Sequence, residues 1–181
     1  MRILLLIIMM IFSASGTGFQ NENLFVKIPK NFKLDFKDYN KQTNISLLEF
    51  VPKNESVKNW SKMITITSYT KNINLTASEY IQRMKEMWKK HCKKSYTKIL
   101  PNGMQNGYKY AFIKMYCSKT KITNKEELVF MKAIKGKTRF YVVQKAFSYK
   151  PNKKTIEETM KYFQKVTVFD TKKGNGPKIL R

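Results

Sequence analysis

Histidine and cysteine are almost absent from this 181-residue sequence, which has one His and two Cys. Structural zinc sites and iron–sulfur clusters need several such ligands on one centre, so both are nearly excluded. No carboxylate-rich calcium loop, no Gly-rich phosphate loop and no Gly-x-Ser-x-Gly elbow occurs, and a single His completes no plausible Ser/His/Asp arrangement. We therefore expect no catalytic residues, no metal and no cofactor.

Acidic residues are also scarce. The 12 Asp and Glu are set against 36 Lys and Arg, which gives a formal net charge of +24. Such a charge favours polyanionic surroundings, so an anionic polymer or an anionic lipid surface is the expected partner. Only 4 of the 36 cations are Arg. Because base-edge recognition relies on bidentate Arg contacts, sequence-specific nucleic-acid binding is disfavoured.

Glycine and proline are few, at 7 and 5, and 42% of the residues are hydrophobic, so a folded core is expected rather than disorder. The sequence begins with the three parts of a secretory signal peptide: basic Met1-Arg2, apolar Ile3 to Phe12, and small Ser13 to Gly16. The alternative is a retained membrane anchor, but the apolar run is about half of the roughly 20 residues that a spanning helix needs. We expect residues 1–16 to be removed, and the loss of Arg2 lowers the formal net charge from +24 to +23. The mature protein is then expected to be periplasmic or secreted and to have no transmembrane segment.

The remaining pattern predicts one α+β domain over residues 17–170, followed by a flexible basic tail at 171–181. An antiparallel sheet with two main helices packed on it is expected. The first three strands are predicted to form a meander, Pro101-Asn102-Gly103 and Asn106-Gly107 to form turns, and the last strand to close the sheet. The predicted strands are 24–28, 32–39, 46–51, 63–67, 96–100, 108–117, 126–134, 139–147 and 166–169, and the helices run from 77 to about 91 and from 155 to 165.

The first predicted helix begins with a capping box, Thr76-Ala77-Ser78-Glu79. In the second predicted helix, Glu157 and Glu158 are expected in the first turn, where their negative charge interacts favourably with the helix dipole. This interpretation is preferred to the alternative that they act as catalytic acids. The residues expected to face the sheet are Ala77, Tyr80, Ile81, Met84, Met87 and Trp88 in the first helix and Ile156, Met160 and Phe163 in the second.

Cys92 and Cys117 are the two cysteines of an exported chain, so one disulfide is the natural pairing. It closes a loop of about 25 residues. The alternative is a reactive thiol with His91 as its base. Adjacent residues on a helix project about 100° apart and rarely form a catalytic pair, which disfavours this alternative.

Basic clusters lie at the predicted ends of elements and in loops, where an anion could be bound. An AT-rich coding background would also enrich Lys and Asn, so the alternative is a solvated surface with no ligand. It does not account for the scarce acids. The candidate anion-binding residues are Lys89, Lys90, Lys93, Lys94, Lys135, Lys137, Arg139, Lys153 and Lys154.

The segment Glu49-Phe50-Val51-Pro52, with Glu55, Val57 and Trp60, resembles a pattern of an uncharacterised family of bacterial periplasmic or secreted proteins. The likeness continues through most of the chain, although Cys117-Ser118 and Phe169-Asp170 depart from the family's cysteine motifs. It implies a PsbP-like α/β/α sandwich and no enzymatic activity. Trp60, Tyr141 and Phe147 are interpreted as core residues rather than as surface-binding aromatics.

These observations favour an exported, non-enzymatic binding or accessory protein of the bacterial envelope that contacts an anionic partner through a basic surface. One alternative is a protein released from the bacterium, such as a type II secretion substrate, that acts on a host. A small hydrolase that uses His91 is a weaker third hypothesis.

Overall fold

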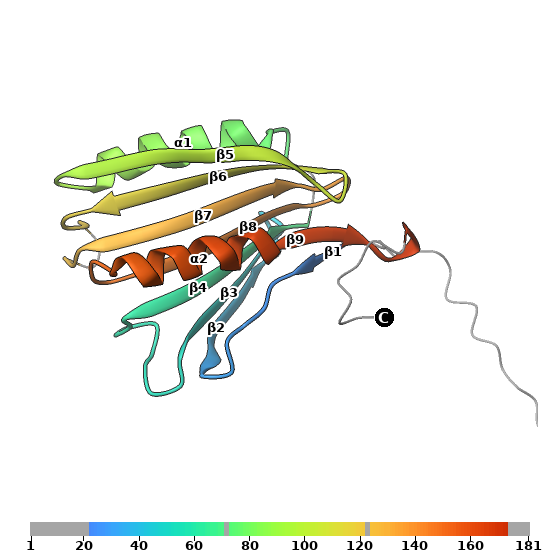
Figure 1. Ribbon diagram of the computed structural model, residues 1–181. Coiled ribbons are helices and arrows are strands. Elements are labelled where there is room, and N and C mark those ends of the chain that lie inside the picture. Colours follow the sequence, from blue (N-terminus) through green and yellow to red (C-terminus); the bar gives the residue numbers. More distant parts are fainter. Residues whose placement is uncertain (1–21, 71–72, 122–123, 174–181) are drawn as a thin grey trace, which may run out of the picture.

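The computed structural model describes residues 22–70, 73–121 and 124–173, which form an α+β fold (Figure 1). The expected signal peptide at residues 1–16 lies outside the described residues. Of the expected tail, only Thr171–Lys173 is described, as the short 3-10 helix η1.

Seven antiparallel strands build the main sheet, in the order β2-β3-β4-β8-β7-β6-β5. Each strand alternates side chains between the two faces, so both faces can bury apolar residues. The strands are β2 (Phe32–Asn40), β3 (Ile45–Pro52), β4 (Lys62–Tyr69), β5 (Ser95–Gln105), β6 (Tyr108–Cys117), β7 (Glu127–Lys135) and β8 (Phe140–Phe147).

The first and last strands form a separate two-stranded sheet. β1 (Glu22–Phe25) pairs with β9 (Thr167–Asp170), with Leu24 opposite Val168. The predicted three-strand meander and the closing strand are therefore wrong: the meander is β2-β3-β4, and β9 does not join the main sheet. Local sequence cannot choose between partners that are more than 140 residues apart, and here burial of Leu24 and Val168 beside the α2-side core decides.

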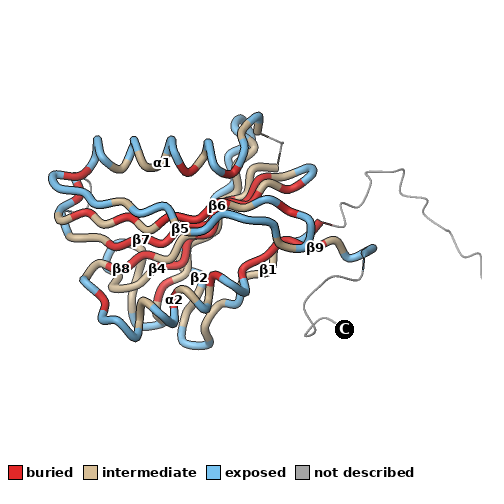
Figure 2. Tube along the Cα trace, turned by 45° about the horizontal axis from the view of Figure 1, so that its top comes forward, coloured by how far each residue is buried: buried red, intermediate tan, exposed pale blue. Residues whose placement is uncertain are grey.

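The two helices cover opposite faces of the main sheet. In β7, Val129 and Met131 belong to the core under α1 (Ala77–His91), whereas Phe130 belongs to the core under α2 (Lys153–Lys165). Figure 2 shows buried residues concentrated along β6, β7 and β8, between the helices. The predicted α+β class, with two main helices packed on an antiparallel sheet, is confirmed.

Two local sequence signals are confirmed in detail. The capping box of α1 is formed, because Thr76 Oγ1 accepts from Glu79 N and Glu79 Oε2 accepts from Thr76 N. Asn106 and Gly107 both have positive φ, at 53° and 83°, as the tight β5–β6 turn requires. The predicted turn at 101–103 is wrong. β5 continues through it with an irregularity between Leu100 and Gly103, where Asn102 Oδ1 accepts from Phe112 N and replaces a main-chain bond.

α2 begins two residues before its predicted start. Asn152 is the N-cap, with its side chain accepting from Thr155 N at 2.9 Å. The first turn therefore contains Lys153 and no acidic residue, and Glu157 and Glu158 lie one turn later, contrary to prediction. In α1, Met87 was expected on the buried face but is 49% exposed.

Gly136, in the β7–β8 turn, anchors the N-terminal strand. A Cβ atom there would lie 2.1 Å from Glu22 Oε1 and 2.6 Å from Arg139 O, while Glu22 Oε2 accepts from Lys137 N at 2.7 Å. We expect Gly136→Ala to displace β1 and to lower the free energy of unfolding by about 2 kcal/mol. Urea denaturation measures the loss. Gly107→Asn is the matched control, since a Cβ at Gly107 in the β5–β6 turn would meet no neighbouring atom and Asn tolerates positive φ. An unchanged denaturation midpoint for Gly136→Ala would contradict this role.

Candidate functional site

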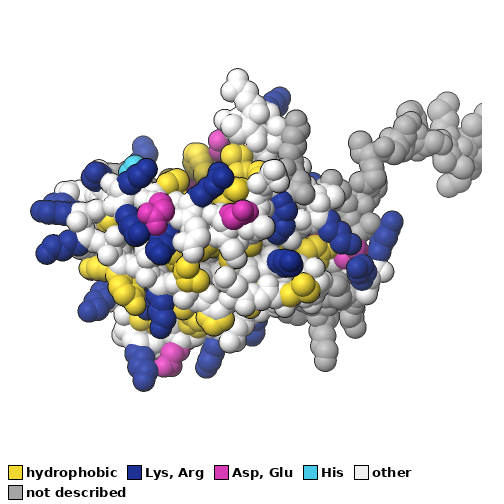
Figure 3. Space-filling view, turned by 90° about the horizontal axis from the view of Figure 1, so that it is seen from above, with side chains coloured by type: hydrophobic (Ala, Val, Ile, Leu, Met, Phe, Trp, Pro, Cys, Tyr) yellow, Lys and Arg dark blue, Asp and Glu magenta, His cyan; other side chains and the backbone are white. Residues whose placement is uncertain are grey.

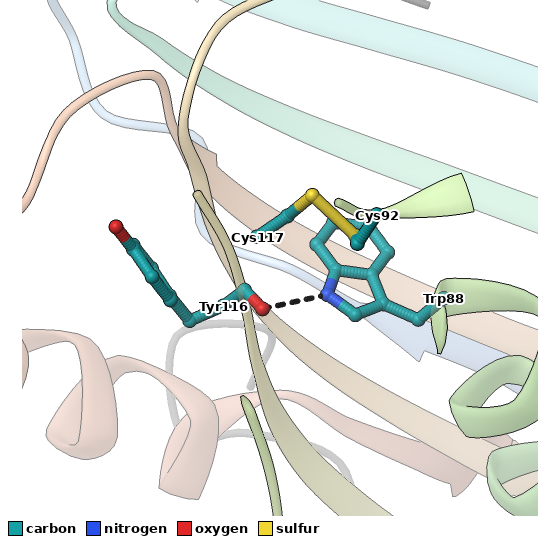
Figure 4. Close-up of a disulfide and its surroundings, with 4 residues drawn as sticks. All are labelled: Trp88, Cys92, Tyr116 and Cys117. Carbon is teal, nitrogen blue, oxygen red and sulfur yellow. Dashed lines mark hydrogen bonds between the residues drawn. A yellow bond between two sulfur atoms is a disulfide. The ribbon is translucent and has the colours of Figure 1, made fainter. Parts of the chain in front are cut away.

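At one end of the main sheet, the disulfide lies where the end of α1, the end of β6 and the segment at Thr120 meet. Cys92, just after α1, is bonded to Cys117 at the end of β6, and their Cα atoms are 5.5 Å apart (Figure 4). Cys92 also pairs with Thr120 in an isolated β-bridge. Trp88 packs beside the disulfide and donates from Nε1 to the main-chain oxygen of Tyr116 at 3.0 Å. The predicted disulfide is confirmed, and neither sulfur is a free thiol.

Exposed lysines surround this disulfide. Main-chain hydrogen bonds join Lys93 to Lys119, Lys94 to Ser118 and Lys121 to His91, so lysines from both segments lie together. β8 also ends here, opposite the start of β7, and α2 then begins. We call this region the basic end, and its exposed lysines are Lys89, Lys90, Lys93, Lys94, Lys119, Lys121, Lys125, Lys150, Lys153 and Lys154.

Figure 3 shows Lys and Arg side chains over much of one face, several of them projecting from the end near the histidine. The first turn of α2 adds to the positive charge of the basic end. The N-terminal end of α2 carries the positive end of the helix dipole, and Lys153 and Lys154 reinforce this charge rather than offset it. Six of the nine predicted anion-binding residues thus share one end of the molecule.

Lys135, Lys137 and Arg139 do not join them. They lie in or beside the β7–β8 turn, at the other end of the nine-residue strand β7, which is about 27 Å long. The Lys135 ammonium donates to Ile73 O and lies 5.9 Å from the Phe140 ring centroid. These three candidate residues therefore form a second basic group, separated from the basic end by the length of β7.

A cleft beside the basic end combines aromatic and cationic side chains. Its volume is about 310 Å³. Tyr116 donates to Glu126 Oε2 at 3.1 Å, and this hydrogen bond raises the pKa of the Tyr116 phenol. The cleft therefore offers flat apolar rings beside positive charge. It is lined by Tyr96, Lys114, Tyr116, Leu128, Lys150, Pro151 and Ile156.

The aromatic residues that the sequence assigned to the core are placed there. Tyr141 and Phe147 are buried in the core under α2. Trp60 is half-buried and packs against the core under α1, and its main-chain oxygen accepts from Ser148 Oγ at 2.8 Å.

Lys132 is a site residue that the sequence analysis missed. It is only 3% exposed and faces α2 from the middle of β7. Its ammonium donates to Gln105 Oε1 at 2.9 Å, to Phe163 O at 3.1 Å and to Val166 O at 2.6 Å, so it caps the C-terminal end of α2. The Tyr110 ring centroid lies 4.3 Å away. The signal was available, since Lys132 is the one charged residue within the run 128–134 of a buried strand.

Burial lowers the pKa of Lys132 from 10.5 to about 8. Lys145, on the neighbouring strand β8, has its pKa lowered by burial and by the nearby Lys62. Its ammonium lies 4.9 Å from the Tyr162 ring centroid on α2. Lysines from two central strands thus contact α2.

The Lys132 pKa predicts a pH dependence of stability. Above pH 8 the folded state releases this proton, whereas the unfolded chain keeps it until about pH 10.5, so the folded state gains stability as pH rises through this window. Relative to Lys132→Met, we expect the wild-type free energy of unfolding to rise by about 2 kcal/mol between about pH 7.5 and 9.5. Urea denaturation of the wild type and of Lys132→Met at a series of pH values measures this difference. Parallel curves would contradict the assignment.

No helix among the described residues has the length and apolarity to cross a membrane. No family model matches the sequence, and no curated protein matches it. Among solved structures, the fold is similar to that of LpqN from Mycobacterium tuberculosis, described as involved in cell envelope biogenesis, with a TM-score of 0.46 and 8% identity over 82% of this chain and 83% of that chain. The expected PsbP-like family is not confirmed, and the comparisons assign the chain to no family.

Proposed function

We propose that the protein is an exported, non-enzymatic binding protein that attaches to an anionic surface of the bacterial envelope through its basic end. The observation that carries this proposal is that exposed lysines share one end of the sheet. Those at the end of α1 and in the β6–β7 connection lie beside the disulfide, and those at the start of α2 lie at the same end on the opposite face.

The small number of acidic residues supports the same function. The chain has 12 acidic residues to 36 cationic ones. Lys89 of the basic end is paired with Glu86 at 3.0 Å, and the 12 acidic residues of the chain are too few to pair with all of its lysines. Lysines close to an anionic membrane contribute about 1 kcal/mol each, so several acting together support stable attachment.

The disulfide supports a periplasmic or secreted location, because such bonds persist in oxidising compartments. Fractionation of the native bacterium distinguishes an envelope role from release. Recovery in the periplasmic extract agrees with the proposal, and recovery in the culture supernatant favours the host-directed alternative.

Charge reversal at the basic end tests the binding surface. We expect Lys93, Lys94, Lys153 and Lys154, all replaced by Glu, to weaken binding to phosphatidylglycerol vesicles at least about 10-fold at about 0.05 M salt. The matched control replaces four lysines away from the basic end by Glu, with the same change in net charge. The control residues are Lys109, Lys165, Lys172 and Lys173.

The measurement is vesicle co-sedimentation, repeated with neutral phosphatidylcholine vesicles and with immobilised heparin. A lipid surface is supported by binding to phosphatidylglycerol, and an anionic polymer by binding to heparin alone. Equal losses in the two four-lysine variants would show that net charge, and not the basic end, determines binding. Absence of binding to both probes at low salt would refute the proposed function.

A further inference from the structure

A cavity of about 300 Å³ lies between α2 and the β5–β6 hairpin, away from the basic end. Its wall is mostly apolar, with methionine and aromatic side chains from three elements. Methionine is unbranched and adapts its shape to what it packs against. The lining residues are Pro101, Met104, Gln105, Tyr110, Phe112, Lys132, Met160, Phe163 and Gln164.

The cationic group in this lining is Lys132, and its ammonium contacts neutral oxygens. These are the Gln105 amide oxygen and the main-chain oxygens of Phe163 and Val166. A buried ammonium is costly unless a negative charge compensates it, and attraction between opposite charges is stronger in the protein interior than in water. A carboxylate in the cavity would supply the compensating charge.

Of the three oxygens, only that of Gln105 belongs to a side chain, so it can be exchanged without moving the main chain of α2. The other two belong to the main chain at the end of the helix. The Gln105 side chain is flexible, and its position is set by a hydrogen bond in which Nε2 donates to Gln164 O at 3.0 Å. Its neighbour Met104 is 63% exposed, so the hairpin side of the cavity opens to solvent.

We propose that this cavity binds a small amphipathic carboxylic acid, whose carboxylate replaces the Gln105 amide oxygen at Lys132 Nζ and whose apolar part packs against Met104, Phe112 and Met160. The volume is at the lower limit of ordinary ligand sites, which favours a medium-chain acid over a long lipid tail. The proposal is independent of anionic-surface binding, because the cavity and the basic end share no residue.

Decanoate is the probe, with decanol as its neutral counterpart. At about 0.15 M salt, which screens the exposed lysines, we expect calorimetry to give at least about 10-fold tighter binding of decanoate than of decanol. Lys132→Met should abolish this preference and keep weak decanol binding. The matched control, Lys98→Met, removes an exposed lysine of β5 that does not line the cavity and should leave the preference unchanged.

Equal decanoate affinity in wild type and Lys132→Met would overturn the proposal, as would the absence of decanoate binding to the wild type. Two further variants keep it testable if Lys132→Met does not fold. Gln105→Ala should bind decanoate at least as tightly as wild type, because it removes the oxygen that the ligand displaces. Met160→Trp should fill the cavity and weaken decanoate binding at least about 10-fold. Weaker binding in Gln105→Ala, or unchanged binding in Met160→Trp, would also overturn the proposal.

Discussion

Phe163→Ala is expected to lower the free energy of unfolding by about 4 kcal/mol. Phe163 is 1% exposed, and its ring centroid lies 4.8 Å from that of Phe112 and 6.4 Å from that of Phe130. It is the aromatic residue through which α2 contacts β6 and β7. Truncation removes buried apolar surface and leaves a cavity that rigid neighbouring strands cannot fill, and both effects add to the loss.

The measurement is urea denaturation followed by circular dichroism. The main-chain oxygen that Lys132 contacts is retained in Phe163→Ala, so only the ring is tested. Gln164→Ala, at the next and exposed position of α2, is the control and should change stability by less than about 0.5 kcal/mol. A loss below about 1 kcal/mol for Phe163→Ala would mean that α2 is held mainly by other contacts.

Removal of the disulfide should lower the free energy of unfolding by about 3 kcal/mol. Cys92 and Cys117 are 25 residues apart, so the bond restricts a sizeable loop of the unfolded chain. We expect the double variant Cys92→Ala/Cys117→Ala to lose this contribution. The same variant should loosen the junction between α1 and the β6–β7 connection, which carries Lys93, Lys94 and Lys119 of the basic end.

Reductant provides the matched control. Dithiothreitol should lower the denaturation midpoint of the wild type to that of the double variant and leave the variant unchanged. If the variant also binds phosphatidylglycerol vesicles less tightly while still folded, the disulfide positions the basic end. A wild-type midpoint that is insensitive to reductant would contradict a stabilising disulfide.

The sequence predicted helix starts and turns correctly where the residues concerned interact with their own neighbours in the chain. The capping box at Thr76 and Glu79 satisfies backbone groups of the same helix turn, so it acts without tertiary contacts. Asn106-Gly107 similarly specifies its own turn through positive φ. At 101–103 the turn signal was misleading, because the bond from Phe112 N to Asn102 Oδ1 comes from the partner strand.

The candidate sites were also predicted only as far as they depend on neighbouring residues in the sequence. The basic clusters were visible as runs of lysine, but whether two runs meet depends on strand direction and length, and β7 separates Lys135 from Lys94. Lys132 was overlooked because a single charge in an apolar strand does not reveal what it faces. Its three acceptors come from β5, α2 and the residue after α2.

The amino-acid sequence by itself determined the α+β class, the pairing of the only two cysteines and the large positive charge, because each depends on composition or on neighbouring residues. Tertiary structure alone decided that β1 pairs with β9, that six candidate lysines share one end while three do not, and that Lys132 lies at a cavity. These features join residues distant in the chain, so they depend on packing and on the direction of strands rather than on local preference.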